Sequence, residues 1–288
     1  MLGHRATAAW LTTWLVLPEE RRHQTATKLL LGVLRDHDGL VGTLGGNDTT
    51  LGVLGRLRFE TEWALPRWIR PLDPDAFATL LEAAGQAAGT PAKLLPVSEP
   101  PAGIAIRRWA PDDAAAWDRA WTQRFAPRLV GTARDAAHLR WRYVDHPRFD
   151  YTLTLAWSGE TPVGLLVHRV QRVCERPESV VRIVELLGDD DAQAALLGAM
   201  LQEPDVATAA FADLYGASPA QRPPMGTGFV ADDAARPVPS LFAPLDNRRV
   251  GLTAAFRLLG PSADAAPGVL ESGAAYVTRS DCDQDRPN

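Results

Sequence analysis

The sequence predicts an α/β protein with a mixed sheet, and three observations indicate this class. Apolar residues make up 46% of the 288 residues, which is ample for a core and excludes a mainly disordered chain. The spacing of apolar residues changes repeatedly between the alternation of a strand and the three- and four-residue spacing of a helix. A stretch rich in Pro and Gly at 91–103 interrupts this pattern, which then starts again. We therefore expect two units, 1–90 and 104–288, joined by a linker at 91–103.

Before the linker, expected strands and helices alternate. The apolar run Ala8–Leu17 ends at Pro18, which predicts a buried strand, and Thr25–Arg35 has its leucines at helical spacing. The next expected elements are a strand at Leu40–Leu44, a helix at Thr49–Leu57, an extended run at Trp63–Pro71 and a helix at Asp75–Ala88.

After the linker, we expect one strand, two helices, three strands, a helix and a further strand. Pro111 followed by Asp112 and Asp113 fits a helix start, because proline suits the first turn and acidic groups favour the positive end of the helix dipole. The expected strands are Ile104–Trp109, Tyr151–Trp157, Pro162–Val170, Val180–Leu187 and Ala207–Tyr215, and the expected helices are Pro111–Phe125, Asp135–Val144 and Ala192–Leu201. Near the end of the chain, Ser240–Leu245 and Gly251–Leu259 are expected to pair as a closing hairpin.

Charge and composition exclude several classes of function. The formal net charge of −5 argues against a nucleic-acid partner held by phosphate contacts. No uninterrupted apolar stretch is long enough to cross a membrane, so we expect a cytoplasmic protein. Cys174 and Cys282 are far apart in the sequence and form no CxxC pair, so we expect neither a disulfide framework nor a metal site.

One segment carries a recognisable motif. Val16–Leu30 (VLPEERRHQTATKLL) resembles the coenzyme-binding loop of the GNAT (Gcn5-related N-acetyltransferase) family, in which Arg/Gln-x-x-Gly-x-Gly/Ala lies between a central strand and a helix. Arg21 takes the first position, Gln24 stands where the family has glycine, and Ala26 takes the last. The resemblance implies that the free N–H groups and the dipole at the helix start bind the pyrophosphate of acetyl-CoA. The residues that it assigns to coenzyme binding are Leu17, Arg21, Arg22, His23, Gln24, Thr25, Ala26 and Asn47.

The same resemblance continues along the first unit. Gly46-Asn47 and Arg58-Phe59 resemble the strand-end Asn and the Gly-Phe of the family. The family often has a tyrosine five residues before that Phe, as the general acid toward the departing thiolate, and here this position is Leu54. The resemblance implies that 1–90 is the C-terminal half of a GNAT-like domain and 104–288 a complete one. Whether the start codon lies too far downstream, or an incomplete half packs on the complete domain, is left open.

The second unit resembles the family in layout and departs from it in the motif. Gly188 to Asp191 stands at the coenzyme position, where three carboxylates would repel a pyrophosphate, and Pro224 and Met225 stand near the tyrosine position. The segment Leu139–Tyr151 is similar to a passage of GNAT-like proteins associated with surface polysaccharide, which implies an amino sugar as acceptor.

Glu185 is the candidate catalytic residue, because an acid within the apolar run RIVELLG matches the strand carboxylate that the family uses to take a proton from the amine. The alternative is an outward-facing residue of an edge strand, or a partner of Arg182. For Asp281, Asp283 and Asp285 the interpretation is a solvated acidic tail, with Cys282 as a surface thiol.

Together these features predict a GNAT-type N-acetyltransferase that moves an acyl group from acyl-CoA to a small-molecule amine, including an amino sugar. An inactive GNAT-like module that binds a ligand or a partner, and an aminoacyl transferase of the Fem type, are the alternatives.

Overall fold

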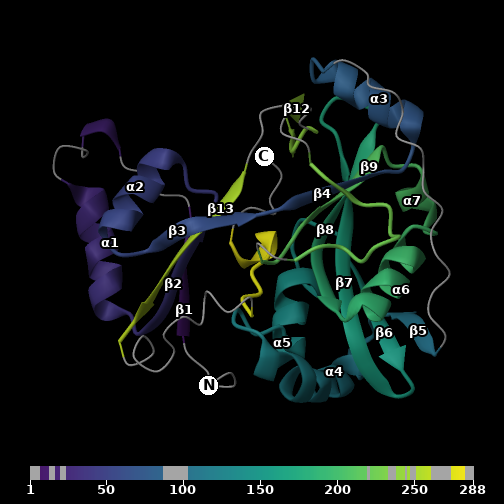
Figure 1. The fold of residues 1–288 in the computed structure, drawn as a ribbon, viewed down its shortest axis with the longest axis horizontal. Helices are drawn as coiled ribbons and strands as arrows, with labels where there is room; N and C mark the ends of the chain where they lie inside the picture. Colours follow the sequence, from purple (N-terminus) through teal and green to yellow (C-terminus); the bar gives the residue numbers. More distant parts are fainter. Residues whose placement is uncertain are drawn as a thin grey trace.

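The computed structural model describes residues 7–12, 17–19, 24–86, 103–218, 221–232, 238–243, 245–246, 251–260 and 274–282. Within them, the strands form two large sheets and a short two-stranded ribbon (Figure 1). The structure does not describe residues 1–6, 13–16, 20–23 and 87–102, nor the shorter gaps after residue 218 and the C-terminal end. Nearly all of the predicted linker therefore lies outside the described residues.

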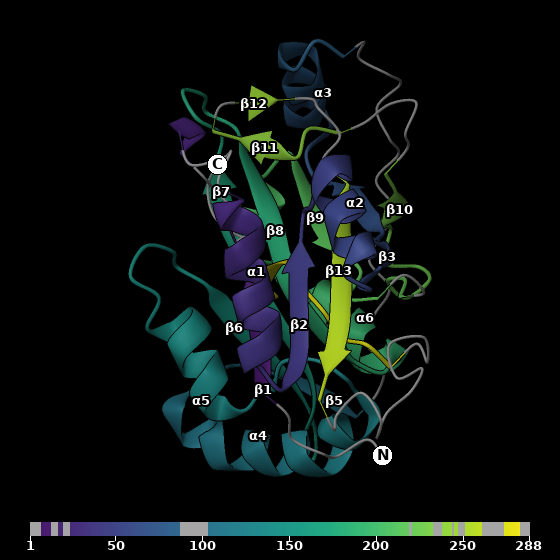
Figure 2. The same ribbon diagram turned by 90° about the vertical axis from the view of Figure 1, so that its left-hand side faces the viewer.

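The first sheet is built mostly from the N-terminal part of the chain. Its order is β1 (Thr7–Leu11), β2 (Gly39–Leu44), β13 (Leu252–Leu259) and β3 (Glu60–Leu65), and β1 and β2 are parallel. Helices α1 (Thr25–Asp36) and α2 (Asp48–Arg56) cover the face that is turned away from the second sheet (Figure 2). Leu30, Leu54 and Val41 meet in the core between these helices and the sheet.

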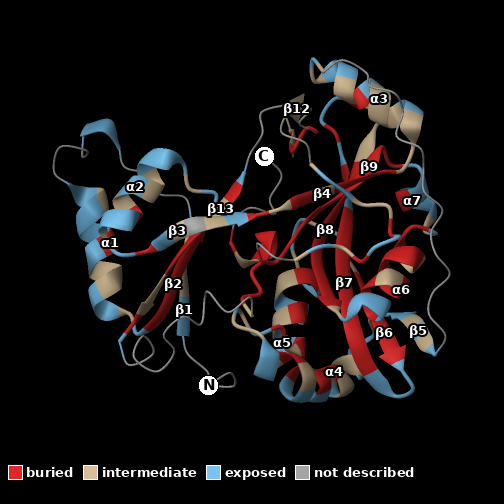
Figure 3. Cartoon of the chain, viewed as in Figure 1, coloured by how far each residue is buried: buried red, intermediate tan, exposed pale blue. Residues whose placement is uncertain are grey.

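The second sheet contains seven strands. Their order is β10 (Val230–Ala231), β4 (Arg67–Pro71), β9 (Phe211–Tyr215), β8 (Ser179–Gly188), β7 (Thr161–Arg172), β6 (Thr152–Ser158) and β5 (Ile104–Arg108). Helices α4 (Ala114–Ala120) and α5 (Ala136–Leu139), each continued by a π-helical turn, pack on one face, and α6 (Asp190–Met200) and α7 (Pro204–Ala207) pack on the other. Its central strands are the most thoroughly buried part of the molecule (Figure 3).

Each sheet takes one strand from the other end of the chain. Strand β4 follows β3 after Pro66, leaves the first sheet and pairs with β9, and then leads into α3 (Pro74–Ala83). In return, β13 lies between β2 and β3. The predicted division into 1–90 and 104–288 stays a prediction, but the strand pairing crosses it in both directions.

Two halves of the fold also repeat the same pattern. In the first sheet, parallel β1 and β2 are followed across the sheet by antiparallel β13 and β3. In the second, parallel β8 and β9 are followed by antiparallel β4 and β10. Helix α1 lies between β1 and β2 in the chain, as α6 lies between β8 and β9. The starts of α1 and α6 are therefore equivalent places.

The regular elements largely follow their predicted spans, including α1, β2, α6 and β8. The prediction that Ser240–Leu245 and Gly251–Leu259 pair as a closing hairpin is wrong. Residues Leu252–Leu259 pair with β2 and β3, while Leu241–Phe242 (β11) pairs with Leu245–Asp246 (β12). Both segments are apolar enough for a strand, but the partners of Leu252–Leu259 lie about 190 to 220 residues earlier in the sequence, too far for local pattern to identify.

Candidate functional site

The start of α1 has no side-chain cap. Gln24 is the N-cap residue, and its side chain makes no capping hydrogen bond to the first turn. Its φ of 56° lies in the left-handed region that favours glycine, which is the residue that the resemblance places here. The first turn carries no acidic residue, and Lys28 is exposed one turn further on. This helix start is therefore compatible with an anionic group.

Only some of the predicted coenzyme-binding residues lie in the described part. Gln24, Thr25 and Ala26 open α1, and Leu17 is 59% exposed. Arg21, Arg22 and His23 lie outside the described residues. The structure therefore leaves these seven assignments as predictions.

The eighth of these predicted residues, Asn47, has a clear structural contact. Its side-chain oxygen accepts a hydrogen bond from the N–H of Thr50 at 2.9 Å and so caps α2. An N-cap of this kind contributes about 1 kcal/mol to stability. The carboxamide oxygen is thus engaged by the protein itself.

The start of α6, the equivalent place in the second sheet, has the opposite character. Asp189 is the N-cap, and its side chain accepts a hydrogen bond from the N–H of Ala192 at 3.0 Å. Asp190 and Asp191 occupy the first turn, and Arg124 forms an ion pair with Asp189 at 2.7 Å. A carboxylate already accepts a hydrogen bond from one amide of the first turn, so an incoming phosphate would meet like charge.

Glu185 lies in the interior, contrary to the interpretation as an outward-facing edge residue. Strand β8 lies between β7 and β9, and a bulge at Val184 places Glu185 opposite Val167, on the face covered by α4 and α5. Its partner is Arg134 at 3.2 Å rather than Arg182, which lies 3.6 Å from Asp213. Both faces of β8 are covered, so the side chain is buried on either one, and the bulge decides that Glu185 lies on the face of α4 and α5.

Five donors surround the Glu185 carboxylate, and three of them come from the C-terminal segment, defined here as Ala274–Cys282. The donors are Tyr143 Oη at 2.6 Å, Tyr276 Oη at 2.8 Å, Ser280 Oγ at 2.9 Å, and Arg134 Nε and Thr278 Oγ1 at 3.2 Å. In Figure 1 this segment is the yellow turn between the two sheets.

The surroundings keep Glu185 ionised. Burial raises the pKa of a carboxyl group, but the charge of Arg134 and the hydrogen bonds from Tyr143, Tyr276 and Ser280 outweigh burial, so the pKa of Glu185 lies below its ordinary value. Burial and the charge of Glu185 raise the pKa of both tyrosines. A general base needs a pKa nearer the working pH and a lone pair that faces the substrate. This carboxylate has neither property.

Asp281 and Cys282 are buried, although their sequence context predicted a solvated acidic tail with a surface thiol. The side chain of Asp281 is fully buried and contacts Arg134 at 2.5 Å, and Cys282 is 8% exposed with its thiol 3.7 Å from the carbonyl oxygen of Leu11. Asp283 and Asp285 lie outside the described residues.

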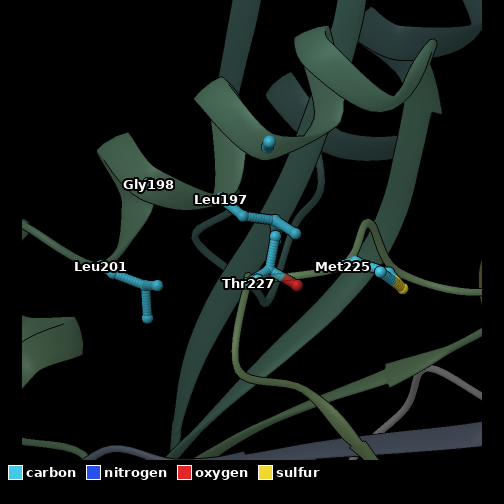
Figure 4. A pocket seen from close by; sticks show the side chains of 7 residues that line it. Leu197, Gly198, Leu201, Met225 and Thr227 are labelled. Atoms are coloured by element: carbon cyan, nitrogen blue, oxygen red, sulfur yellow. The ribbon is translucent and has the colours of Figure 1, made fainter. Parts of the chain in front are cut away.

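The positions equivalent to the family tyrosine carry no proton donor. Leu54 is 1% exposed and packs in the core beneath α2. Met225 is 98% exposed and lines a small apolar pocket with Leu197, Leu201 and Thr227 (Figure 4).

Sequence reasoning missed the partners of Glu185. Arg134, Tyr143 and Tyr276 are 51, 42 and 91 residues away from it. An acid in a buried strand does signal that donors are needed, but the signal does not say which residues supply them.

Two kinds of feature are absent from the part of the chain that the structure describes. No group of three or more His, Cys, Asp or Glu side chains in this part could hold a metal ion. In the same part, no helix has both the length and the apolar character that crossing a bilayer requires.

Solved structures share this fold, although no family model and no curated protein matches the sequence. A GCN5-related N-acetyltransferase from Anabaena variabilis superposes with a TM-score of 0.55 at 13% identity, over 90% of this chain and 57% of that one. One from Kribbella flavida gives 0.54 at 17% identity, over 92% and 55%. N-myristoyltransferase from Saccharomyces cerevisiae, solved with bound myristoyl-CoA and inhibitors, gives 0.52 at 9% identity, over 91% and 64%.

These likenesses establish the fold. The chain has the mixed α/β fold of the GNAT acyl-CoA N-acyltransferases and spans 55% to 64% of the length of the three structures.

Proposed function

We propose that the chain is a GNAT-type N-acyltransferase that takes its acyl group from acetyl-CoA or another acyl-CoA. The acceptor is a small-molecule amine, including an amino sugar. The coenzyme site of the proposal is the start of α1, where Gln24, Thr25 and Ala26, together with Arg21, Arg22 and His23 outside the described residues, would hold the pyrophosphate.

The contrast between the two equivalent helix starts carries this proposal. At α1 the cap position holds an uncharged residue that does not cap, and the first turn has no acid. At α6 a carboxylate caps the helix and two more follow it. Because helix N-termini attract anions through their amides and dipole, α1 is the start at which a diphosphate fits.

The chemistry of the proposal is direct transfer. The amine nitrogen attacks the thioester carbonyl, the C–N bond forms, the C–S bond breaks, and the proton lost by the nitrogen balances the charge of the departing thiolate. All four tyrosines lie beyond residue 142, so the first unit offers none as a proton donor. Its contribution is orientation of the reactants and polarisation of the carbonyl by main-chain N–H groups.

Gln24→Asp tests the coenzyme site. Aspartate tolerates a left-handed φ, so the variant should unfold at or above the wild-type temperature. A carboxylate at the N-cap of α1 would face the proposed pyrophosphate with like charge, which should weaken acetyl-CoA binding at least about tenfold. Calorimetric titration measures the affinity, and Asp190→Asn at the start of α6 is the matched control that should leave it unchanged.

Equal affinity in wild type and Gln24→Asp would remove the coenzyme site from α1. A gain of affinity in Asp190→Asn would instead indicate a coenzyme site at the start of α6, because this change removes a negative charge there.

The alternative is a GNAT-like module that binds its ligand without turnover. Buried Leu54 and fully engaged Glu185 favour it. Release of free CoA in the presence of amines distinguishes the two, because the module binds acetyl-CoA and releases no thiol above the rate of the buffer.

A further inference from the structure

The second sheet contains a fork between two parallel strands. Strands β8 and β9 are paired as far as Ile183 and Leu214. Strand β8 then continues to Gly188, while the chain after β9 leaves the ladder. Main-chain groups of Leu186 on one side and Ala217 on the other face this gap, because their hydrogen-bond partners come from neither strand.

The chain itself supplies a partner to each of these main-chain groups. The carboxamide of Gln221 accepts from the N–H of Ala217 at 2.5 Å and donates to the carbonyl oxygen of Leu186 at 3.4 Å. The carbonyl oxygen of Ala217 accepts from the N–H of Val277 at 2.8 Å. These three main-chain groups of the fork are therefore satisfied from within the molecule.

We propose that Gln221 acts as a built-in ligand of this fork. Its carboxamide takes the position that an amide of a coenzyme A arm would need, so the second sheet cannot accept acyl-CoA. On the proposed function, each chain then binds a single acyl-CoA, at the start of α1.

The surroundings of Gln221 fit this role. A Cβ built on Gly216 would lie 3.0 Å from the carbonyl oxygen of Gln221, so a glycine there lets the two stretches approach closely. On the far side of the fork, Tyr276 is fixed by Glu185 at 2.8 Å. Gln221 itself is half-buried, so its removal leaves a space that a small molecule can reach.

Gln221→Gly with chemical rescue tests the proposal. The amide of Ala217 should exchange its hydrogen at least tenfold faster in the variant than in wild type. Pantetheine, which has two amide groups and no phosphate, should slow that exchange again at millimolar concentration, and it should have no effect on Ala217 in wild type. Gln202→Gly, at an exposed glutamine after α6, is the matched control and should leave the Ala217 amide unchanged.

Three results would overturn the proposal. They are an unchanged Ala217 amide in Gln221→Gly, faster exchange that pantetheine does not slow, and protection of Ala217 by pantetheine or acetyl-CoA in wild type. The proposed function has a separate readout, the amides of Thr25 to Leu30 with acetyl-CoA. If these show no protection, the transferase proposal fails, while the rescue at Ala217 still decides the role of Gln221.

Discussion

At Glu185, a carboxylate is stable in the middle of a sheet because donors enclose it. Isolated burial of such a charge is very costly, and the effective penalty is still several kcal/mol after relaxation. Arg134 provides the opposite charge, and Tyr143, Tyr276 and Ser280 satisfy the remaining lone pairs. Through these hydrogen bonds, Glu185 holds the C-terminal segment against strand β8.

Glu185→Gln tests this role. Removing the charge leaves Arg134 with Asp281 as its remaining acidic partner and turns one carboxylate acceptor into a donor, so the free energy of unfolding should fall by about 3–5 kcal/mol. Urea denaturation at pH 7 measures it. The exposed Glu160→Gln is the control and should stay within about 0.5 kcal/mol of wild type. A stable Glu185→Gln variant with a shifted pH profile of acyl transfer would instead support a catalytic base.

At the scale of elements, the C-terminal segment lies between the two sheets and contacts both of them. Val277 and Cys282 pack against the inner face of the first sheet, while Tyr276 and Ser280 contact Glu185 of the second. Gly131 lets this segment approach, because a Cβ there would lie 2.2 Å from the carbonyl oxygen of Tyr276.

Two glycine substitutions should have opposite effects on thermal unfolding. Gly131→Ala forces the C-terminal segment away from its partner and should cost about 1–3 kcal/mol. Gly52→Ala, in the exposed part of α2 with nothing within 4 Å of the new Cβ, should gain up to about 1 kcal/mol because alanine is the better helix former. A neutral Gly131→Ala would show that the segment does not need its present position.

At the scale of the whole molecule, a second buried cluster joins three parts of the chain. Asp213 of β9 contacts Arg67 of the exchanged strand β4 at 3.0 Å, Arg279 of the C-terminal segment at 3.1 Å and Arg182 of β8 at 3.6 Å. Burial raises the pKa of Asp213, but the three guanidinium groups outweigh it and hold that pKa far below its ordinary value.

The lowered pKa values predict how stability depends on pH. A carboxyl whose pKa is lower in the folded than in the unfolded state contributes stability above the unfolded value, about 4, and loses it as the pH falls toward the folded value. The Asp213 and Glu185 contributions should therefore be constant from pH 5 to pH 8 and decline below about pH 4.

Asp213→Asn should reduce the free energy of unfolding by about 3–5 kcal/mol at pH 7, and its difference from wild type should narrow as the pH falls from 4 to 2. Urea titrations at several pH values measure this, with the exposed Asp150→Asn as control. If the difference in the free energy of unfolding between wild type and Asp213→Asn stays constant down to pH 2, the charge of Asp213 does not contribute to the stability of the cluster.

Local pattern predicted much of the fold but less of the candidate site. The predicted spans Thr25–Arg35 and Val180–Leu187 nearly coincide with α1 and β8, because the periodic spacing of buried apolar residues can be recognised within a short stretch of sequence. The start of α1 was also identified, from short-range spacing around Gln24 and Ala26. The role of Gln221 was not, because a single polar residue in an irregular stretch has no periodic signal.

The sequence by itself determined which segments are strands and helices and where a helix start is free of acidic groups, since both depend on neighbours along the chain. Only the tertiary structure decided that β4 and β13 exchange sheets, that Glu185 faces inward and that Gln221 fills the second fork. Those outcomes depend on contacts between residues that are far apart in the sequence. For Glu185, a bulge of one residue in β8 also decides which face of the sheet the side chain takes, and the apolar pattern around it does not reveal that bulge.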